Sequence, residues 1–229
     1  LVACTDVDRC ENQPGEALGL NAEVVLNLVT VIRAMQTRPY LIQISTDMVY
    51  SGSGPHSENS PINPINYYSM TKFFGDMAST VVPSTVLRTN FVGRSYTPQR
   101  QSFTDWLFQS LRDKRSIQVF NDILFSPLAI SRLADTLGKV IEKRPMGIFN
   151  MGSSDGMTKA EFAFKFAKYL GLNPSLMNAS SSSGGGELRA RRPSDMRLNS
   201  EKLESVLGFS LGTTDDQIAL VAEEYRAFV

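Results

Sequence analysis

The sequence predicts an α/β fold built on a doubly wound parallel sheet. Apolar residues recur at helical spacing in several segments, short apolar runs alternate with these segments, and the connections are short. This alternation favours parallel strands joined by crossover helices. The chain has 229 residues, of which 42% are hydrophobic, so it can bury a large core in one domain or in two small ones.

The first part of the chain carries the clearest alternation. Residues 1–5 are apolar and strand-like, and residues 6–15 form a polar turn region. A long helix follows, which we expect to be buried on more than one side because its apolar positions are numerous: Ala17, Leu20, Val24, Val25, Leu28, Val29, Val31, Ile32 and Met35. The next expected elements are a strand over 40–44, a loop over 51–64, a helix over 67–80 and a strand over 85–88.

The second part of the chain is less regular. Apolar spacing predicts helices near residues 103–111 and 133–141, and residues 147–150 form a short strand. Capping boxes beginning at Thr158 and Thr214 open two further helices. Between them, residues 180–186 are only serine and glycine, so we expect a mobile loop that orders over bound substrate.

Composition excludes several classes of function. The charged residues balance at 23 basic and 23 acidic, which argues against nucleic-acid or membrane-surface binding. No apolar stretch approaches the roughly 18 residues of a membrane span, and no leader opens the chain. We expect Cys4 and Cys10 to fill apolar space, and His56, the single histidine, to be exposed in its loop. Metal sites and Ser-His-Asp chemistry are therefore not expected, and the predicted location is cytoplasmic.

The strongest chemical signal is Tyr68 with Lys72, four residues apart and so on one helix face. An ammonium near a phenol lowers its pKa and makes it a usable acid. The spacing alone is weak, because chance produces it often on solvated helices. Thr46 adds context, since it ends an apolar strand at the edge where open α/β sheets bind ligands. A hydroxyl and a Tyr/Lys pair converging on one crevice form a moderately specific pattern.

The sequence resembles the extended short-chain dehydrogenase/reductases, and within them the dTDP-4-dehydrorhamnose reductase branch. Residues 45–50 (Ser-Thr-Asp-Met-Val-Tyr) and 64–72, which end in Tyr-x-x-x-Lys, carry the resemblance most specifically, and residues 5–11, 87–93 and 192–199 agree. The resemblance implies a Rossmann-like doubly wound sheet. It makes residues 1–93 a partial dinucleotide-binding domain, and residues 94–229 a mixed segment that completes the sheet and forms a smaller substrate-binding lobe.

The resemblance also implies a reaction, the NAD(P)H-dependent reduction of the 4-keto group of a nucleotide-activated deoxy sugar. Tyr68 would protonate the carbonyl oxygen as hydride arrives from NADPH or NADH, and Thr46 would orient it. Lys72 would bind the nicotinamide ribose and depress the tyrosine pKa. Implied contacts to the cofactor are Ala3, Asn21, Ser45, Tyr68, Lys72 and Thr89, and implied contacts to the substrate are Asp47, Met48, Asn90, Phe91 and Arg192. The implied partners are the nucleotide sugar and, as one allowed assembly, a homodimer.

Three departures from the family pattern stand out. The family often has tryptophan at the position of Phe91 and an aromatic residue at that of Met48. The Gly-x-x-Gly-x-x-Gly turn that receives the pyrophosphate does not occur in the sequence. We therefore expect the first three strands, roughly 60 residues, to be missing before Leu1. A chain that starts there should bind NADH or NADPH weakly and fold poorly by itself.

Two other functions remain open on the sequence. One is a nucleotide-sugar epimerase or dehydratase, which Asp47 disfavours because dehydratases usually carry a further acidic pair in this region. The other is a non-catalytic, reductase-like regulatory subunit. The intact Thr46, Tyr68 and Lys72 argue against that subunit, and the missing glycine-rich turn argues for it.

Overall fold

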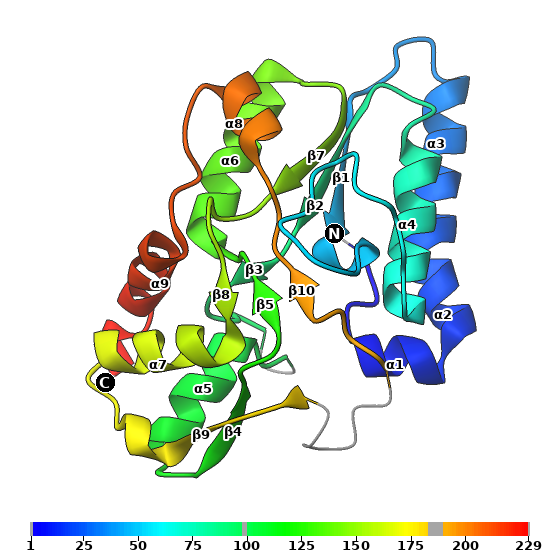
Figure 1. Cartoon of the computed structure of the whole chain (residues 1–229). Helices are drawn as coiled ribbons and strands as arrows, with labels where there is room; N and C mark the ends of the chain where they lie inside the picture. The colour runs from blue at the N-terminus through cyan, green and yellow to red at the C-terminus, as the bar shows by residue number, and fades with distance from the viewer. Residues whose placement is uncertain (1, 98–99, 183–189, 229) are drawn as a thin grey trace.

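The computed structural model describes residues 2–97, 100–182 and 190–228. A three-stranded parallel sheet lies at its centre, in the order β1 (Leu41–Thr46), β2 (Ser84–Thr89), β7 (Gly147–Met151) (Figure 1). Thr46 pairs with Thr89, and Thr89 with Met151, so the carboxyl ends of the strands lie level at one edge. The predicted parallel sheet is confirmed, and this edge is where such sheets bind ligands.

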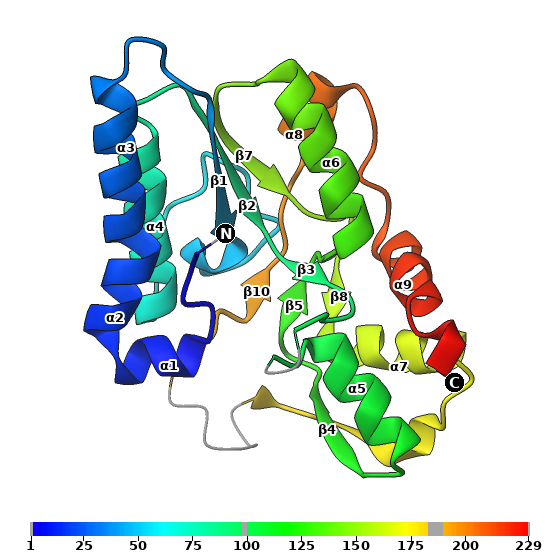
Figure 2. The ribbon, with the colours of Figure 1, turned by 180° about the vertical axis from the view of Figure 1, so that it is seen from behind.

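Helices cover both faces of the sheet (Figures 1 and 2). On one face lie α3 (Val24–Ala34) and α4 (Tyr67–Ser79), and on the other lie α6 (Ile130–Lys143) and α8 (Glu201–Leu207). Leu87 of β2 and Phe149 of β7 pack with Leu133, Val140 and Leu203 in one apolar cluster. Burial of both faces confirms the doubly wound arrangement.

The amino-terminal segment differs from its prediction. Residues 2–6 form no strand, because the side chain of Asn21 rather than a neighbouring strand binds the backbone of Cys4. Residues 7–12 form helix α1 (Val7–Asn12) instead of a turn, and Asp6 caps it by accepting a hydrogen bond from Arg9 N at 3.0 Å. The expectations of a strand over 1–5 and of a turn region after it are therefore wrong for the residues described.

The long helix has its predicted extent but a different buried face. It runs through α2 (Pro14–Leu18), a π-helical turn η1 (Gly19–Glu23) and α3. The buried positions of α3 are Val25, Val29 and Ile32, which pack on α4 and on Leu41. Its outer face is apolar but exposed, which corrects the expectation of burial on more than one side; the exposed residues are Val24, Leu26, Leu28, Val31 and Met35.

This helical run also corrects the statement about membrane spans. Among the described residues, Pro14–Ala34 is one helix that is long and apolar enough, by length and composition, to cross a bilayer. A third of its most apolar window is buried inside the protein. Core helices of globular proteins meet the same criterion, so the finding is weak evidence for a membrane.

The smaller lobe packs three helices around an aromatic core. They are α5 (Phe103–Arg112), α7 (Lys159–Tyr169) and α9 (Thr214–Glu223), and Phe125, Phe162, Phe166 and Tyr225 lie fully or almost fully buried between them. The capping box of Thr158 and Glu161 is confirmed. The second box begins at Thr213, one residue earlier than expected, because its hydroxyl accepts from Asp216 N.

Short strands complete the lobe and its connections. They are β3 (Phe91–Val92) with β6 (Leu128–Ala129), β4 (Ile117–Phe120) with β9 (Met177–Ser180), and β5 (Leu124–Phe125) between β8 (Met157–Thr158) and β10 (Asp195–Met196). Single 3-10 turns are η2 (Asp47–Val49), η3 (Pro174–Leu176) and η5 (Arg226–Phe228). The predicted mobile loop over 180–186 lies mostly outside the described residues.

The loop over 51–64 is anchored by a buried polar network. Arg88, 1% exposed, donates to Asp76 at 3.2 Å and to the Tyr50 hydroxyl at 2.8 Å. His56 stacks on Tyr50 with ring centroids 5.0 Å apart, and it is 4% exposed. The expectation that His56 faces solvent is wrong, because the ring covers the tyrosine of this network and bonds the backbone of Asp195.

Candidate active site

The carboxyl end of β1 turns sharply into η2, and this turn presents two predicted site residues. Thr46 accepts a hydrogen bond from Met48 N at 3.2 Å, which caps the 3-10 turn. The same hydroxyl donates to Asp47 Oδ1 at 3.2 Å. Both side chains are almost fully buried, at 3% and 1% exposed, so the turn holds them in fixed positions.

Asp47 is a buried carboxylate with three polar neighbours. Asn90, at the end of β2, donates to Asp47 Oδ2 at 2.8 Å. Burial raises the pKa of Asp47 to about 6, while hydrogen bonds from Asn90 and Thr46 and the charge of Lys159 oppose the rise. The structure thus joins two predicted substrate residues, Asp47 and Asn90, and makes the first of them titrate near neutral pH.

Tyr68 and Lys72 lie on the first two turns of α4, which Asn66 caps by accepting from Ser69 N at 2.8 Å. Burial raises the pKa of Tyr68, and a hydrogen bond with the Thr46 hydroxyl lowers it by less. The phenol therefore stays protonated at neutral pH. This corrects the expectation of a tyrosine pKa depressed by the neighbouring lysine, because desolvation outweighs the charges around it.

Lys72 points to the backbone of β1 rather than to Tyr68. Its Nζ donates to the carbonyl oxygen of Ile44 at 2.6 Å, and the residue is 6% exposed. Burial lowers the pKa of Lys72, and the charge of Asp76 on the same helix raises it again by less. The bond to Ile44 fixes α4 against the strand that ends in Thr46, so the lysine sets the spacing between these two elements.

A π-helical turn brings the amino-terminal segment to α4. Asn21, 1% exposed, accepts from Cys4 N at 2.9 Å and donates to Cys4 O and to Thr71 Oγ1, both at 3.0 Å. A π turn inserts one residue into a helix and often occurs at functional sites. Gly75 permits the contact, because a Cβ there would lie 2.5 Å from the carbonyl oxygen of Asn21. Asn21 therefore holds the amino-terminal segment against α4.

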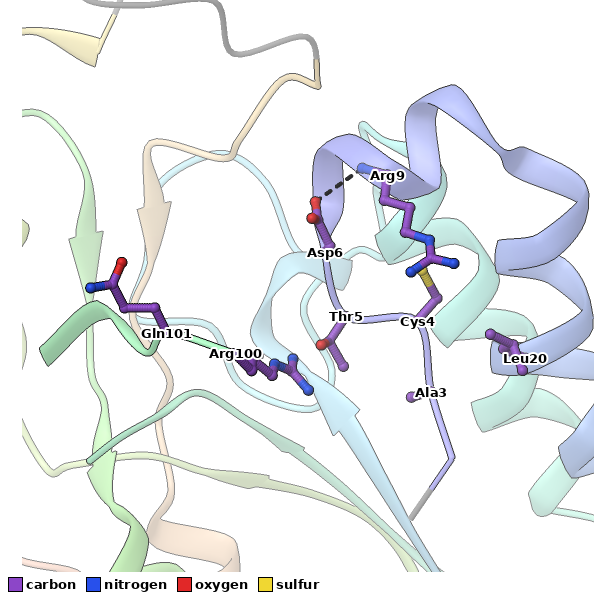
Figure 3. Close-up of a pocket in the computed structure, with 8 residues that line it drawn as sticks. All are labelled: Ala3, Cys4, Thr5, Asp6, Arg9, Leu20, Arg100 and Gln101. Atoms are coloured by element: carbon purple, nitrogen blue, oxygen red, sulfur yellow. Dashed lines mark hydrogen bonds between the residues drawn. The ribbon is translucent and has the colours of Figure 1, made fainter. Parts of the chain in front are cut away.

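A cavity of about 530 Å³ opens beside this segment. Arg9 of α1 and Arg100 of the segment before α5 flank Thr5 at its wall (Figure 3). The predicted cofactor residue Ala3 also lines it, together with Cys4, Asp6, Leu20 and Gln101. Cavities of this size hold small ligands. The Arg100 guanidinium suits phosphate oxygens, whereas the Arg9 guanidinium is paired with Glu16, so the donors present fit part of a dinucleotide.

The other predicted site residues differ in their burial and in their partners. Ser45 is buried in β1, and its hydroxyl has no hydrogen-bond partner among the described residues; Thr89 ends β2 level with Thr46. Met48 packs on the aromatic core of the lobe, whereas Phe91 opens β3 and is 50% exposed. Arg192 is committed to an ion pair with Asp8, with N–O distances of 2.9 and 3.0 Å.

Sequence reasoning missed two features of the site. The charge of Lys159, in the smaller lobe, lowers the pKa of Asp47, and the charge of Arg100 lowers the pKa of Tyr68. Cys4 and Cys10, whose sulfur atoms lie 3.4 Å apart, pack with Tyr68 as apolar filling, the role expected of them. The sequence did contain a signal for Lys159. A cation in the first turn of a helix opposes the helix dipole, so its presence there suggests a role other than stabilising the helix.

These features define the class of fold. A parallel sheet wound by helices on both faces, with polar side chains gathered at its carboxyl edge, is a Rossmann-like α/β fold. The family model described as the RmlD substrate binding domain matches residues 1–227, and the chain belongs to this family. The predicted resemblance is therefore confirmed.

Individual relatives agree with the family. A probable low-salt glycan biosynthesis reductase of Haloferax volcanii is 28% identical over 99% of this chain and 76% of its own length. The dTDP-4-dehydrorhamnose reductase of Escherichia coli K12 is 28% identical over 95% of the chain and 75% of its length. The crystal structure of such a reductase from Bacillus anthracis, in complex with NADP, matches with a TM-score of 0.87 at 22% identity, covering 97% and 78% of the two chains.

Proposed function

We propose that this protein reduces the 4-keto group of a nucleotide-activated deoxy sugar, with NADPH or NADH as the reductant. One observation carries the proposal: Thr46 and Asp47, buried at the carboxyl end of β1, lie in the η2 turn that packs against α4, the helix of Tyr68 and Lys72. The names of the relatives, dTDP-4-dehydrorhamnose reductases among them, support the same reaction class.

In the proposed reaction the protein supplies a proton and holds the carbonyl group of the substrate in place. Tyr68, whose phenol is protonated at neutral pH, gives its proton to the carbonyl oxygen. Thr46, held by the η2 turn, turns its hydroxyl proton from Asp47 Oδ1 to that oxygen and so orients it. Asp47 and Asn90 bind hydroxyl groups of the sugar, and the exposed ring of Phe91 offers it an apolar surface.

The cofactor, when bound, supplies the hydride. The cavity lined by Ala3, Thr5, Arg9 and Arg100 is where we place part of it. Lys72 fixes the spacing of α4 and β1 and is the residue that we assign to the nicotinamide ribose. The cofactor contacts of Asn21, Ser45 and Thr89 remain proposals, as does the division into residues 1–93 for the cofactor and 94–229 for the substrate.

The reaction is tested directly by mixing the natural full-length protein with NADPH and dTDP-4-dehydrorhamnose and following the loss of the reduced nicotinamide absorbance. The expected product is the 4-hydroxy sugar nucleotide, with one cofactor oxidised for each sugar reduced. Conversion without net cofactor oxidation would instead indicate an epimerase or dehydratase. Cofactor binding with no conversion of any nucleotide sugar would indicate the non-catalytic subunit.

We also propose a homodimer in the cytoplasm, without a membrane partner. The exposed apolar residues of α3 and of the neighbouring α4, where Phe74 and Met77 lie about half exposed, form one face that a second copy would cover. Ultracentrifugation should show a dimer that Leu28→Glu with Val31→Glu converts to a monomer. A monomeric wild-type protein, or binding of the wild type to vesicles, would contradict the proposal.

A further inference from the structure

Two cysteines meet beside the cavity without forming a bond. Cys4 and Cys10 are both free thiols, and their sulfur atoms lie 3.4 Å apart. Cys4 belongs to the amino-terminal segment that lines the cavity of about 530 Å³, whereas Cys10 lies on α1 (Figure 3). Both sulfur atoms fill apolar space beside Tyr68. An alkyl side chain would fill the same space, so packing alone does not explain why two thiols meet there.

The two thiols differ in access. Cys4, 6% exposed at the cavity wall, can be reached by a small reagent that enters the cavity. Cys10 is 0% exposed, and burial raises the pKa of its thiol to about 12, so it stays protonated and does not react with reagents in solution. Cys4 is therefore the thiol that an oxidant meets first, and Cys10 is the neighbouring thiol that attacks the oxidised sulfur.

The two thiols also differ in freedom of movement. Cys10 is fixed within helix α1, whereas Cys4 lies outside any helix or strand and is held by two backbone hydrogen bonds to the side chain of Asn21. A disulfide bond is shorter than the present contact between the two sulfur atoms, so one of them must move to form it. The movement falls on Cys4, and it shifts Ala3 and Thr5, which line the cavity on either side of it.

We propose that Cys4 and Cys10 form a reversible redox site: a peroxide that enters the cavity converts the two thiols to a disulfide, and the displaced segment then binds the nicotinamide cofactor less tightly. The disulfide is independent of the proposed reductase function. Its effect on the cofactor rests on that function, because part of the cofactor is placed in this cavity. Disulfides in reducing compartments are usually of this transient, redox-sensing kind.

The oxidation takes place in two balanced steps with hydrogen peroxide as the oxidant. The Cys4 sulfur attacks one peroxide oxygen, the O–O bond breaks, and the thiol proton leaves with the other oxygen as water, which gives a sulfenic acid. The Cys10 sulfur then attacks the Cys4 sulfur, the S–O bond breaks, and the hydroxide leaves as water with the Cys10 proton. Two thiols thus lose two electrons and one peroxide becomes two waters. A dithiol reductant reverses the reaction by thiol–disulfide exchange.

The first test detects the bond and needs no activity. Trypsin cleaves after Arg9, between the two cysteines, and next after Arg33, so only a disulfide can keep the peptide of residues 10–33 joined to the peptide that contains Cys4. The natural full-length protein is treated with hydrogen peroxide, alkylated, digested without reductant and analysed by mass spectrometry. The linked pair of peptides should appear, and it should separate when dithiothreitol is added.

The matched control for this test is Cys10→Ala, which should give no linked pair. Oxidation of Cys4 to a sulfinic acid without a linked pair would overturn the proposal. So would a linkage of either cysteine to a third one, or the recovery of both thiols alkylated after the peroxide treatment.

The second test measures binding of the cofactor by titration calorimetry. The Kd for NADPH should rise about fivefold or more after oxidation and return to its first value after reduction. Cys10 is not among the residues that line the cavity, and alanine is a good helix former, so reduced Cys10→Ala should bind NADPH as the reduced wild type does. Its Kd should not change with peroxide. An equal rise in peroxide-treated Cys10→Ala would mean that the disulfide is not the cause and would overturn the switch.

The two tests separate this inference from the function on which its second half rests. A linked pair with the same Kd for NADPH before and after oxidation contradicts the switch, even in an active reductase. A linked pair in a protein that binds neither NADPH nor NADH in its reduced form supports the redox site and contradicts the reductase function.

Discussion

The β1–α4 side of the candidate site and the side formed by the smaller lobe are built from the chain in different ways. Thr46, Asp47, Tyr68 and Lys72 come from one short stretch that contains a strand end and the start of the next helix. The lobe side uses residues far apart in sequence, such as Arg192, which pairs with Asp8 across 184 positions. Local spacing defines the first side, and only folding assembles the second.

The comparison suggests a division of labour. The β1–α4 side holds the proton donor and the hydroxyl that orients the carbonyl, and these are the groups that the reaction itself requires. The lobe side supplies charge and shape around them through Lys159, Arg192 and Phe91. Changes on the first side should therefore affect turnover, and changes on the second side should affect recognition of the sugar.

The largest expected effect comes from removing the proton donor. Tyr68→Phe should lower kcat by about 10² to 10⁴ while the fold remains intact, because a positioned general acid contributes this much. Steady-state kinetics with NADPH and the 4-keto sugar nucleotide provide the measurement. Tyr67→Phe is the matched control, since Tyr67 precedes it on α4 and is 40% exposed. Near-normal turnover in Tyr68→Phe would remove the basis for placing catalysis on this side.

Asp47→Asn should have the next largest effect. It should lower activity and raise stability. Loss of a charged hydrogen-bond acceptor should reduce kcat/KM about 10- to 100-fold at pH 8. It should also abolish the acid limb near pH 6, which the pKa of Asp47 predicts for the wild type. Kinetic pH profiles of the two proteins check both points, and an acid limb that survives in Asp47→Asn would assign it to another group.

The stability effect of Asp47 follows from the direction of its pKa shift. Folding raises the pKa from 3.8 to about 6, so the folded protein binds more protons in that interval. The free energy of unfolding should therefore rise as pH falls from about 6 to 4, although activity falls over the same range. Asp47→Asn should gain on the order of 1–3 kcal/mol at pH 8 in urea unfolding. The exposed Asp215→Asn is the control, and a destabilised Asp47→Asn would refute this account.

The smallest expected effect tests the lobe side through its ion pair. Asp8→Asn should change stability by about 1 kcal/mol at most, because the pair is partly exposed, with Arg192 at 17% and Asp8 at 32%. If Arg192 contacts substrate, releasing it should alter KM for the nucleotide sugar by about two- to fivefold and leave kcat unchanged. Steady-state kinetics give KM and kcat, and titration calorimetry with the nucleotide sugar gives the affinity. No change in affinity in either Asp8→Asn or Arg192→Gln would withdraw Arg192 from the substrate site.

The sequence predicted those parts of the structure that depend on local spacing. The central strands, α4 and the capping box of Thr158 lie within one or two residues of their expected positions, because apolar periodicity and caps act over a few residues. The buried face of α3 was assigned wrongly, because nine apolar positions on one helix do not specify which of them meet α4. Only tertiary contacts decide that.

The candidate site shows the same limit. The Tyr68/Lys72 spacing was visible, but the raised pKa of the phenol follows from its burial beside residues from three other segments, those of Thr46, Cys10 and Arg100. The pairing of Asp47 with Asn90 joins residues 43 positions apart, and the influence of Lys159 spans a longer separation still. His56 was misplaced for a related reason, since a loop rich in glycine and proline gives no sign of the buried tyrosine beneath it.

The geometry of the site depends on the absence of a side chain at Gly75. It lies two turns after Tyr68 on α4, and a Cβ there would lie 2.5 Å from the backbone of Asn21. Even alanine would push the two helix backbones apart, and a stiff helix would carry that displacement along its axis to the phenol. Shifts of about 1 Å can cost about 10²-fold in rate. Substitution of Gly75 is therefore limited by the helix separation that the site requires and not by a chemical role of the residue.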